Sequence, residues 1–166
     1  MNERQLRRRC RDLLRRLKLR RPVDPFELCR RYSQDRGRPL IVATRQLPFP
    51  GGFGGLFPMP SKDLILCPDN ISAEYQAQII FHEVMHLDLD HLAASREAQQ
   101  PLMCGQLMTD SSGARTRSLY ADQREWEAET AATILSEWSG SSAKRAGTAI
   151  GRTEEAVLRA IGGRGV

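Results

Sequence analysis

The sequence contains no long apolar run, at its beginning or elsewhere. No segment approaches the about 18 consecutive apolar residues that cross a membrane, which excludes a helical membrane protein. The first residues are rich in arginine and lack the apolar core of about 7–15 residues that a secretory leader carries. We therefore expect a cytoplasmic protein with no membrane partner.

Cysteine is scarce, and the four cysteines show no C-x-x-C spacing. In a reducing cytoplasm we interpret Cys10, Cys29 and Cys67 as small buried hydrophobic residues rather than halves of disulfides. Cys104 is interpreted in the same way, with metal coordination from a loop as the less favoured alternative. The chain has 166 residues, of which 40% are hydrophobic and 27% charged, and it has no internal repeat. These values predict a single globular domain over residues 1–166.

Positive charge is concentrated in the first part of the chain. Residues 1–38 contain 14 Lys and Arg against 5 Asp and Glu, whereas the remainder contains 11 against 15. Such a basic segment suits nucleic acid or an acidic partner. The simpler interpretation is a solvated arginine face on a surface helix, and this is the one we favour.

Two helices are predicted in this basic part. Residues 3–19 place their apolar side chains on one stripe and arginines on the other face, so that 1–21 reads as an arginine-rich amphipathic helix. Asp24 suits the N-cap of a second helix, and Gly37 suits its end.

The middle of the chain is predicted to form a small sheet. Strands are expected over residues 39–44, 52–57 and 62–67, and the turn between the last two suits a hairpin. Further helices follow over 122–138 and 153–161. This succession predicts an α+β fold in which a mostly antiparallel three-stranded sheet packs on helices. An extended substrate can add to an edge strand of such a sheet, and the sequence leaves open which strand that is.

Two segments lack any clear periodicity. Residues 92–119 are rich in Ala, Ser, Gln and Gly, and a loop of this length inside a compact domain is typical of a flexible lid. Residues 140–166 are predicted to form a weakly ordered tail that contains the short last helix.

The five residues from His82 to His86 read H-E-x-x-H, within an apolar helix predicted over 72–91 that begins at Ser72. On a helix the two histidines lie about 40° and one turn apart, so both can bind one metal ion. Glu83 projects beside them, where it can take a proton from water, and this is the arrangement of a zinc peptidase motif. The alternative is a pair of core histidines satisfied by hydrogen bonds.

A catalytic zinc site takes three protein ligands, and the helix predicted over 122–138 offers the third. Glu127 lies on the apolar stripe of that helix, whereas Glu125 and Glu129 fall about 160° away on the predicted solvent face. Because a buried carboxylate needs a cation, we predict that Glu127 binds the metal. The alternative for Glu127 is a buried ion pair with an arginine of the first helix.

Three other side chains are considered for this site. His91 is disfavoured as a ligand, because in a continuing helix it lies about 180° from His82, and no Gly or Pro breaks the helix. Tyr75 shares the histidine stripe about 10 Å away by helical rise, and Tyr120 lies at the end of the predicted lid. Both tyrosines are candidate oxyanion stabilisers, although a structural role suits Tyr75 better.

At these residues the chain resembles the ImmA/IrrE family of metallopeptidases. That family joins an H-E-x-x-H helix to a later helix reading E-x-E-A-N-x-F-A, and residues 125–132 here read E-W-E-A-E-T-A-A. The resemblance covers about residues 25–138. It implies a zincin-like fold and a gluzincin-type endopeptidase, in which the two motif histidines and Glu127 bind Zn²⁺ and Glu83 is the catalytic acid–base.

Proteins of that family act as regulators in bacteria, their phages and mobile elements. The resemblance therefore implies that the substrate is a helix-turn-helix repressor or antitoxin, which the enzyme cleaves to regulate transcription. A different class of function is a non-proteolytic, toxin-like regulatory module that retains the zinc site and binds a repressor, or binds DNA through the basic N-terminal region. Direct nucleic-acid binding is not favoured, because no recognition-helix motif is present.

Overall fold

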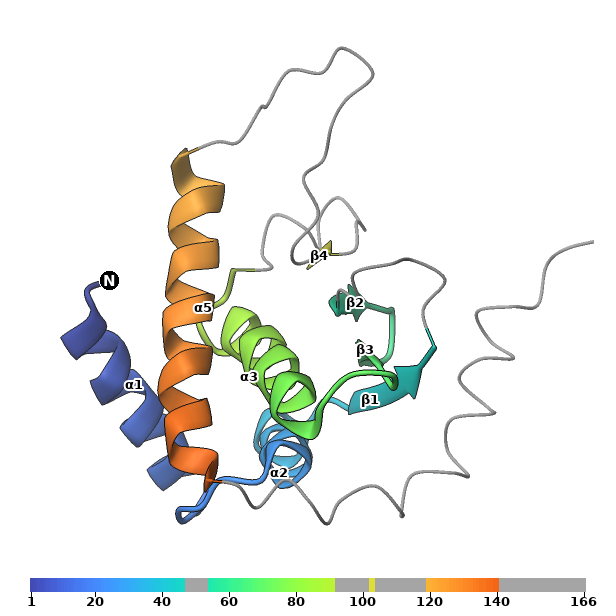
Figure 1. Cartoon of the computed structure of the whole chain (residues 1–166), viewed down its shortest axis with the longest axis horizontal. Coiled ribbons are helices and arrows are strands. Elements are labelled where there is room, and N and C mark those ends of the chain that lie inside the picture. Colours follow the sequence, from blue (N-terminus) through green and yellow to red (C-terminus); the bar gives the residue numbers. More distant parts are fainter. Residues whose placement is uncertain (47–53, 92–101, 104–118, 141–166) are drawn as a thin grey trace, which may run out of the picture.

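The computed structural model describes residues 1–46, 54–91, 102–103 and 119–140, which are coloured in Figure 1. Most of the lid predicted over 92–119, Cys104 included, and most of the tail predicted over 140–166 lie outside these residues. Within the described part of the chain, no helix is both long enough and apolar enough to cross a bilayer.

Helix α1 (Glu3–Arg16) has the predicted amphipathic pattern. Its buried face carries Leu6, Cys10, Leu13 and Leu14. The helix is shorter than predicted because the chain turns away after its cap at Leu17, and Lys18 adopts a positive φ of 54°.

Helix α2 (Pro25–Arg36) begins and ends as the sequence predicts. The Asp24 side chain accepts a hydrogen bond from the backbone N–H of Glu27, which satisfies one of the unpaired donors of the first turn. Gly37 ends the helix in the left-handed conformation, with φ of 63°. The helix packs against the first strand of the sheet.

The sheet has the strand order β1-β3-β2-β4, with β1 (Leu40–Arg45), β2 (Gly55–Pro58), β3 (Asp63–Pro68) and β4 (Leu102–Met103). Strands β2 and β3 form the predicted antiparallel hairpin, and its turn is closed by a 2.9 Å hydrogen bond from the Met59 N–H to the Lys62 carbonyl. The combination of helices with one small sheet confirms the expected α+β class.

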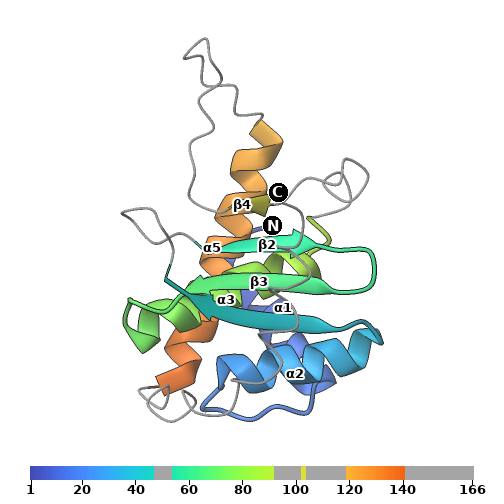
Figure 2. The same cartoon turned by 90° about the vertical axis from the view of Figure 1, so that its right-hand side faces the viewer.

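Two of the three strand pairings are antiparallel, as predicted, but the number of strands and the third pairing need correction. Strand β1 pairs in parallel with β3, and β4 adds a short fourth strand antiparallel to β2 (Figure 2). Because β1 lies on the far side of β3 from β2, the chain crosses the sheet between β1 and β2. Turn signals in the sequence describe local reversals and do not specify such a crossover. Among the described strands, β1 and β4 form the two edges.

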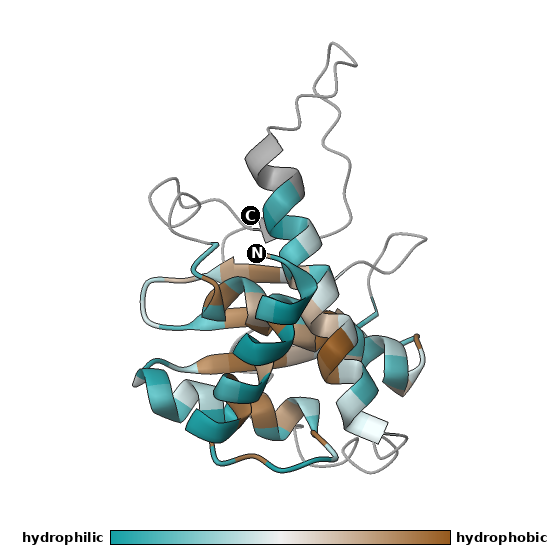
Figure 3. Cartoon of the chain, turned by 90° about the vertical axis from the view of Figure 1, so that its left-hand side faces the viewer, coloured by the Kyte–Doolittle hydropathy of each residue, from teal (hydrophilic) through white to brown (hydrophobic). Residues whose placement is uncertain are grey.

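Helix α3 (Ala73–Asp88) lies between the sheet and helix α5 (Leu119–Ser139) (Figure 1). Ser72 caps α3 as predicted, and every side chain from Ile80 to Asp88 is buried. Helix α5 begins three residues before the predicted start at Asp122, and it packs against α3 on one side and α1 on the other. Helix α5 is therefore covered on two faces. Figure 3 shows the mostly hydrophilic first helix, which begins at the N label, in front of more hydrophobic elements.

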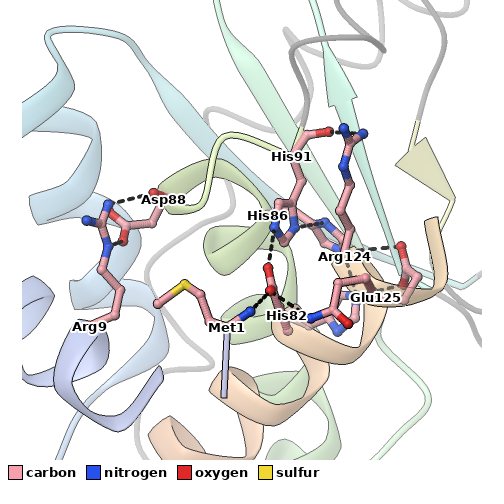
Figure 4. A network of polar contacts seen from close by, with 10 residues as sticks. Met1, Arg9, His82, His86, Asp88, His91, Arg124 and Glu125 are labelled. Carbon is pink, nitrogen blue, oxygen red and sulfur yellow. Dashed lines mark hydrogen bonds and ion pairs between the residues drawn. The ribbon is translucent and has the colours of Figure 1, made fainter. Parts of the chain in front are cut away.

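The C-terminal end of α3 is held to α1 by a buried carboxylate. The Asp88 side chain is 2% exposed and forms ion pairs with Arg9 at 2.7 Å and with Arg16 at 2.6 Å (Figure 4). Arg9 also donates a 2.8 Å hydrogen bond to the backbone carbonyl of Asp88. These contacts tie the last turn of α3 to the helix that covers the opposite face of α5.

We expect Asp88→Asn to lower the free energy of unfolding by about 1.5–3 kcal/mol, because hydrogen bonds to charged groups in a buried position are lost. Asp12→Asn is the matched control, since Asp12 also pairs with two arginines but is 50% exposed. Its loss should stay below about 1 kcal/mol. Urea unfolding followed by circular dichroism measures both values, and equal losses would contradict a special role of Asp88.

Candidate metal centre

The two motif histidines of α3 point toward each other from adjacent turns. His82 is 8% exposed and His86 is 1% exposed. Their Nε2 atoms are 2.9 Å apart, and their rings meet at 64° with centroids 4.7 Å apart (Figure 4). Two imidazole nitrogens this close need either a shared proton or a shared cation between them.

Helix α5 contributes a carboxylate to the same point. One oxygen of Glu125 lies 3.5 Å from Nε2 of His82, and the other lies 3.5 Å from Nε2 of His86. One ligand atom from each of the three residues falls within 4.8 Å of the others. Tetrahedral zinc with bonds of about 2.0–2.1 Å separates its ligand atoms by about 3.3 Å, which is close to the edges of this triangle. The donor set and its spacing therefore fit a divalent metal ion.

On this geometry Glu125 replaces Glu127 in the candidate ligand set. The Glu127 carboxylate lies instead against Nε2 of His91, at 3.3 Å, and against the amino group of Met1. The alternative prediction paired Glu127 with an arginine of the first helix. The structure instead pairs Glu127 with His91 and with the amino group of Met1. Glu127 is nevertheless nearly buried, since its side chain is 12% exposed.

The different position of Glu127 follows from the burial of α5 on two faces. Ala128 and Ala132 are fully buried on the face that meets α3, which is also the face of Glu125. Ala131 is fully buried on the Glu127 face, where its carbonyl lies 3.8 Å from the Cys10 sulfur of α1. The apolar stripe of Glu127 is therefore a real packing face, but it faces α1 rather than the motif histidines His82 and His86.

Glu129 lies on the same face of α5 as Glu125 and contacts Nδ1 of His82, the ring nitrogen that does not face the candidate metal position. Its carboxylate is 3.2 Å from Nδ1 of His82, and Gln78 donates to it at 3.2 Å. Since a carboxylate can only accept, Nδ1 of His82 carries a proton, and in the neutral form of His82 the lone pair is on Nε2, which faces the candidate metal position.

His91 reaches the site although the sequence disfavoured it, because α3 does not continue to residue 91. The His91 N–H bonds to the His86 carbonyl at 2.9 Å, and the Asp90 N–H bonds to the Leu87 carbonyl at 3.2 Å. This is a Schellman ending, in which Asp90 takes the left-handed conformation (φ 54°) that glycine usually supplies. The ending folds His91 back, so that its Nδ1 lies 3.1 Å from Nδ1 of His86.

Acidic neighbours determine the protonation of His82. Burial lowers the pKa of His82, but hydrogen bonds with Glu125 and Glu129 and the negative charge of Glu83 outweigh burial and raise this pKa to about 9. Burial also acts on Glu125 and raises its pKa, yet the contacts with His82 and His86 hold the pKa of Glu125 well below its ordinary value. The site therefore has an electrostatic field that favours a cation.

The other two histidines are driven toward the neutral form. Burial lowers the pKa of His86; the contact with Glu125 opposes this effect, and the positive charge of His82 lowers the pKa further. Burial and the charge of His86 lower the pKa of His91. Neutral imidazoles are the form in which histidine binds a metal.

Glu83, the predicted acid–base, is fully buried on α3 between the two histidine positions. The negative charge of Glu83 raises the pKa of His82. Burial raises the pKa of Cys67 to about 12, and the charge of Glu83 adds to this effect. The carboxylate therefore lies within electrostatic reach of the candidate metal position and of strand β3. Its predicted role in proton transfer stays a prediction.

Tyr75 and Tyr120, the two candidate oxyanion stabilisers, lie in the first turns of α3 and α5. Tyr75 is 51% exposed in the first turn of α3, and it takes no part in the hydrogen bonds of the described histidines. Tyr120 lies in the first turn of α5, and its side chain falls outside the described part of the protein. The oxyanion stabiliser is therefore not assigned.

Comparison with known proteins adds no identification: no protein-family model matches the chain, and a search of curated proteins gave no match. The zincin-like fold and the resemblance to the ImmA/IrrE family therefore stay predictions that depend on the two motifs. What the geometry itself supports is a group of two histidines and a glutamate that can hold a metal ion.

We expect the chain to bind Zn²⁺, and Glu125→Ala to weaken that binding more than about 100-fold, which is the upper range for groups that only support a ligand. Glu127→Ala should lose less, and Glu137→Ala, on the same helix but 49% exposed, should bind like the wild type. Competition with a chromogenic chelator measures all three. If Glu127→Ala loses more than Glu125→Ala, the third ligand is Glu127.

Proposed function

We propose that this protein is a zinc-dependent endopeptidase. The observation that carries the proposal is the convergence of His82, His86 and Glu125 from two helices, with an acid, Glu83, next to the first histidine in the H-E-x-x-H sequence. The Nε2 atoms of the two imidazoles face each other and the same carboxylate, so one cation placed between them would contact all three groups. We propose zinc because the donor set of two nitrogens and one carboxylate oxygen suits it and because the H-E-x-x-H sequence is typical of zinc peptidases.

The residues divide the chemistry of peptide hydrolysis between them. A bound divalent ion would supply Lewis acidity, which lowers the pKa of water and polarises a peptide carbonyl. Glu83 would accept the proton of the attacking water and deliver it to the leaving amine, as general base and then general acid. Glu129 would keep the proton of His82 on Nδ1, so that Nε2 stays available as a ligand atom.

The substrate that we propose is a DNA-binding repressor of the helix-turn-helix type, or an antitoxin of that type. This part rests on the resemblance of the two motif helices to the ImmA/IrrE family, whose members act on such regulators. The protein would then regulate transcription by removing the repressor.

The arginines of α1 favour a protein substrate over direct contact with DNA. Arg9 and Arg16 are engaged by the buried carboxylate of Asp88. Arg7 pairs with Glu3 at 3.0 Å and with Glu137 at 3.1 Å. An arginine whose charge is already compensated within the chain contributes less to binding phosphate groups. This observation agrees with the interpretation of the basic N-terminal segment as a surface helix.

We expect the Zn²⁺-loaded protein to cut a helix-turn-helix repressor into discrete fragments, and Glu83→Gln to reduce the rate by about 10²–10⁴-fold while retaining the metal, because general acid–base catalysis contributes about that factor. Glu74→Gln is the matched control, since Glu74 is an exposed glutamate of the same helix. Gel analysis of the repressor and metal analysis of each variant give the two measurements.

Fragments that persist at the wild-type rate with Glu83→Gln would reject Glu83 as the acid–base. A wild-type protein that binds the repressor and zinc but produces no fragments would instead favour the non-proteolytic regulatory module. A salt-dependent gel shift that requires Arg7, Arg8 and Arg15 would indicate that this module acts on DNA.

A further inference from the structure

A chain of hydrogen bonds leads from His86 away from the candidate metal position. Nδ1 of His86 lies 3.1 Å from Nδ1 of His91, and Nε2 of His91 lies 3.3 Å from the carboxylate of Glu127 (Figure 4). The rings of His86 and His91 meet at 71°, with centroids 5.1 Å apart. His91 is 7% exposed and the Glu127 side chain is 12% exposed, so water has little access to compete for these contacts.

The hydrogen-bonding chemistry of His86, His91 and Glu127 determines which of them donates and which accepts in each contact. A carboxylate only accepts hydrogen bonds, so Nε2 of His91 is the donor to Glu127. In a neutral His91 the other nitrogen, Nδ1, is then an acceptor, and the 3.1 Å contact requires Nδ1 of His86 to be the donor. With its proton on Nδ1, neutral His86 has its lone pair on Nε2, which is the atom that faces His82 and Glu125.

We infer that His91 and Glu127 are positioning residues for the metal, and that they act in series by fixing the tautomer and the ring orientation of His86. This inference rests on the proposed metal site. Supporting hydrogen bonds of this kind orient ligand histidines in metal sites generally. The arrangement also gives the nearly buried Glu127 and the buried His91 a function beyond packing.

The local backbone is built to present His91 in this way. The Schellman ending at Asp90 reverses the chain directly after α3, and the His91 N–H is fixed by the His86 carbonyl one turn earlier. Arg124 of α5 donates to the His91 carbonyl at 3.4 Å. The backbone of His91 is thus held from both helices, while its imidazole lies between a ligand from α3 and a carboxylate from α5.

The experiment measures Zn²⁺ affinity by chelator competition and histidine tautomers by ¹⁵N NMR of the whole chain without metal. We expect His91→Leu to weaken zinc binding by about 10–100-fold. His91→Gln should recover part of that loss, because its side-chain carbonyl can accept the proton of His86. In the wild type, His86 should carry its ring proton on Nδ1, and in His91→Leu this preference should be lost.

A second variant and a control separate a positioning role from damage to the fold. Glu127→Leu should also weaken zinc binding, and the double variant His91→Leu/Glu127→Leu should lose no more than His91→Leu alone, because the two residues act in series. Glu137→Gln, which changes an exposed glutamate of α5, should match the wild type in affinity and tautomer. Circular dichroism identifies any variant that has lost its fold.

The outcomes distinguish this inference from the proposed function. Wild-type zinc affinity in both His91→Leu and Glu127→Leu would overturn the positioning role and leave the metal site intact. A wild-type His86 with its proton on Nε2 would overturn it as well. A wild-type chain that takes up no zinc would overturn the metal site and the positioning role together.

Discussion

The contact between α3 and α5 is the constraint on which the rest of the structure depends. Helix α3 is buried from Ile80 to Asp88, and it carries two imidazoles and a carboxylate into that interior. Buried polar groups are costly unless another element supplies partners, and the sheet on the other side of α3 is apolar at its centre. Helix α5 supplies the partners, through glutamates that contact His82 and His86. The polar contact and the helix packing are therefore the same interaction.

The carboxylates at the interface of α3 and α5 create a negative electrostatic field that favours a cation. Glu125 and Glu129 lie on one side of the histidines, and the charge of Glu83 acts on His82 from within α3. A proton on His82 compensates this negative field only in part, whereas a divalent ion carries twice that charge at the position where the ligand atoms converge. The field that raises the pKa of His82 is thus the field that would favour a metal ion in its place.

Local signals in the sequence predicted the helices and the hairpin, because caps and apolar periodicity depend on neighbouring residues only. The N-caps at Asp24 and Ser72 and the left-handed Gly37 were confirmed in this way. The parallel pairing of β1 with β3 was missed, since it depends on a crossover between distant segments. Glu125, the third residue of the candidate metal group, was not predicted, because α5 is buried on two faces and burial alone could not tell the face toward α3 from the face toward α1. The left-handed residue after α3, which returns His91 to the site, was also missed, because it is Asp90 rather than glycine.

The end of α3 determines more of the site than its five-residue motif does. Asp88 is anchored by two arginines of α1, and two residues later the chain reverses at Asp90. A reversal one residue later would carry His91 about 100° around the helix axis, away from His86. Helix α1 also contacts the Glu127 face of α5, so the arginine-rich first helix packs against both elements that carry the contacts from His86 to Glu127. The basic N-terminal segment is in this sense part of the architecture of the site, in which Arg9 and Arg16 have a structural role.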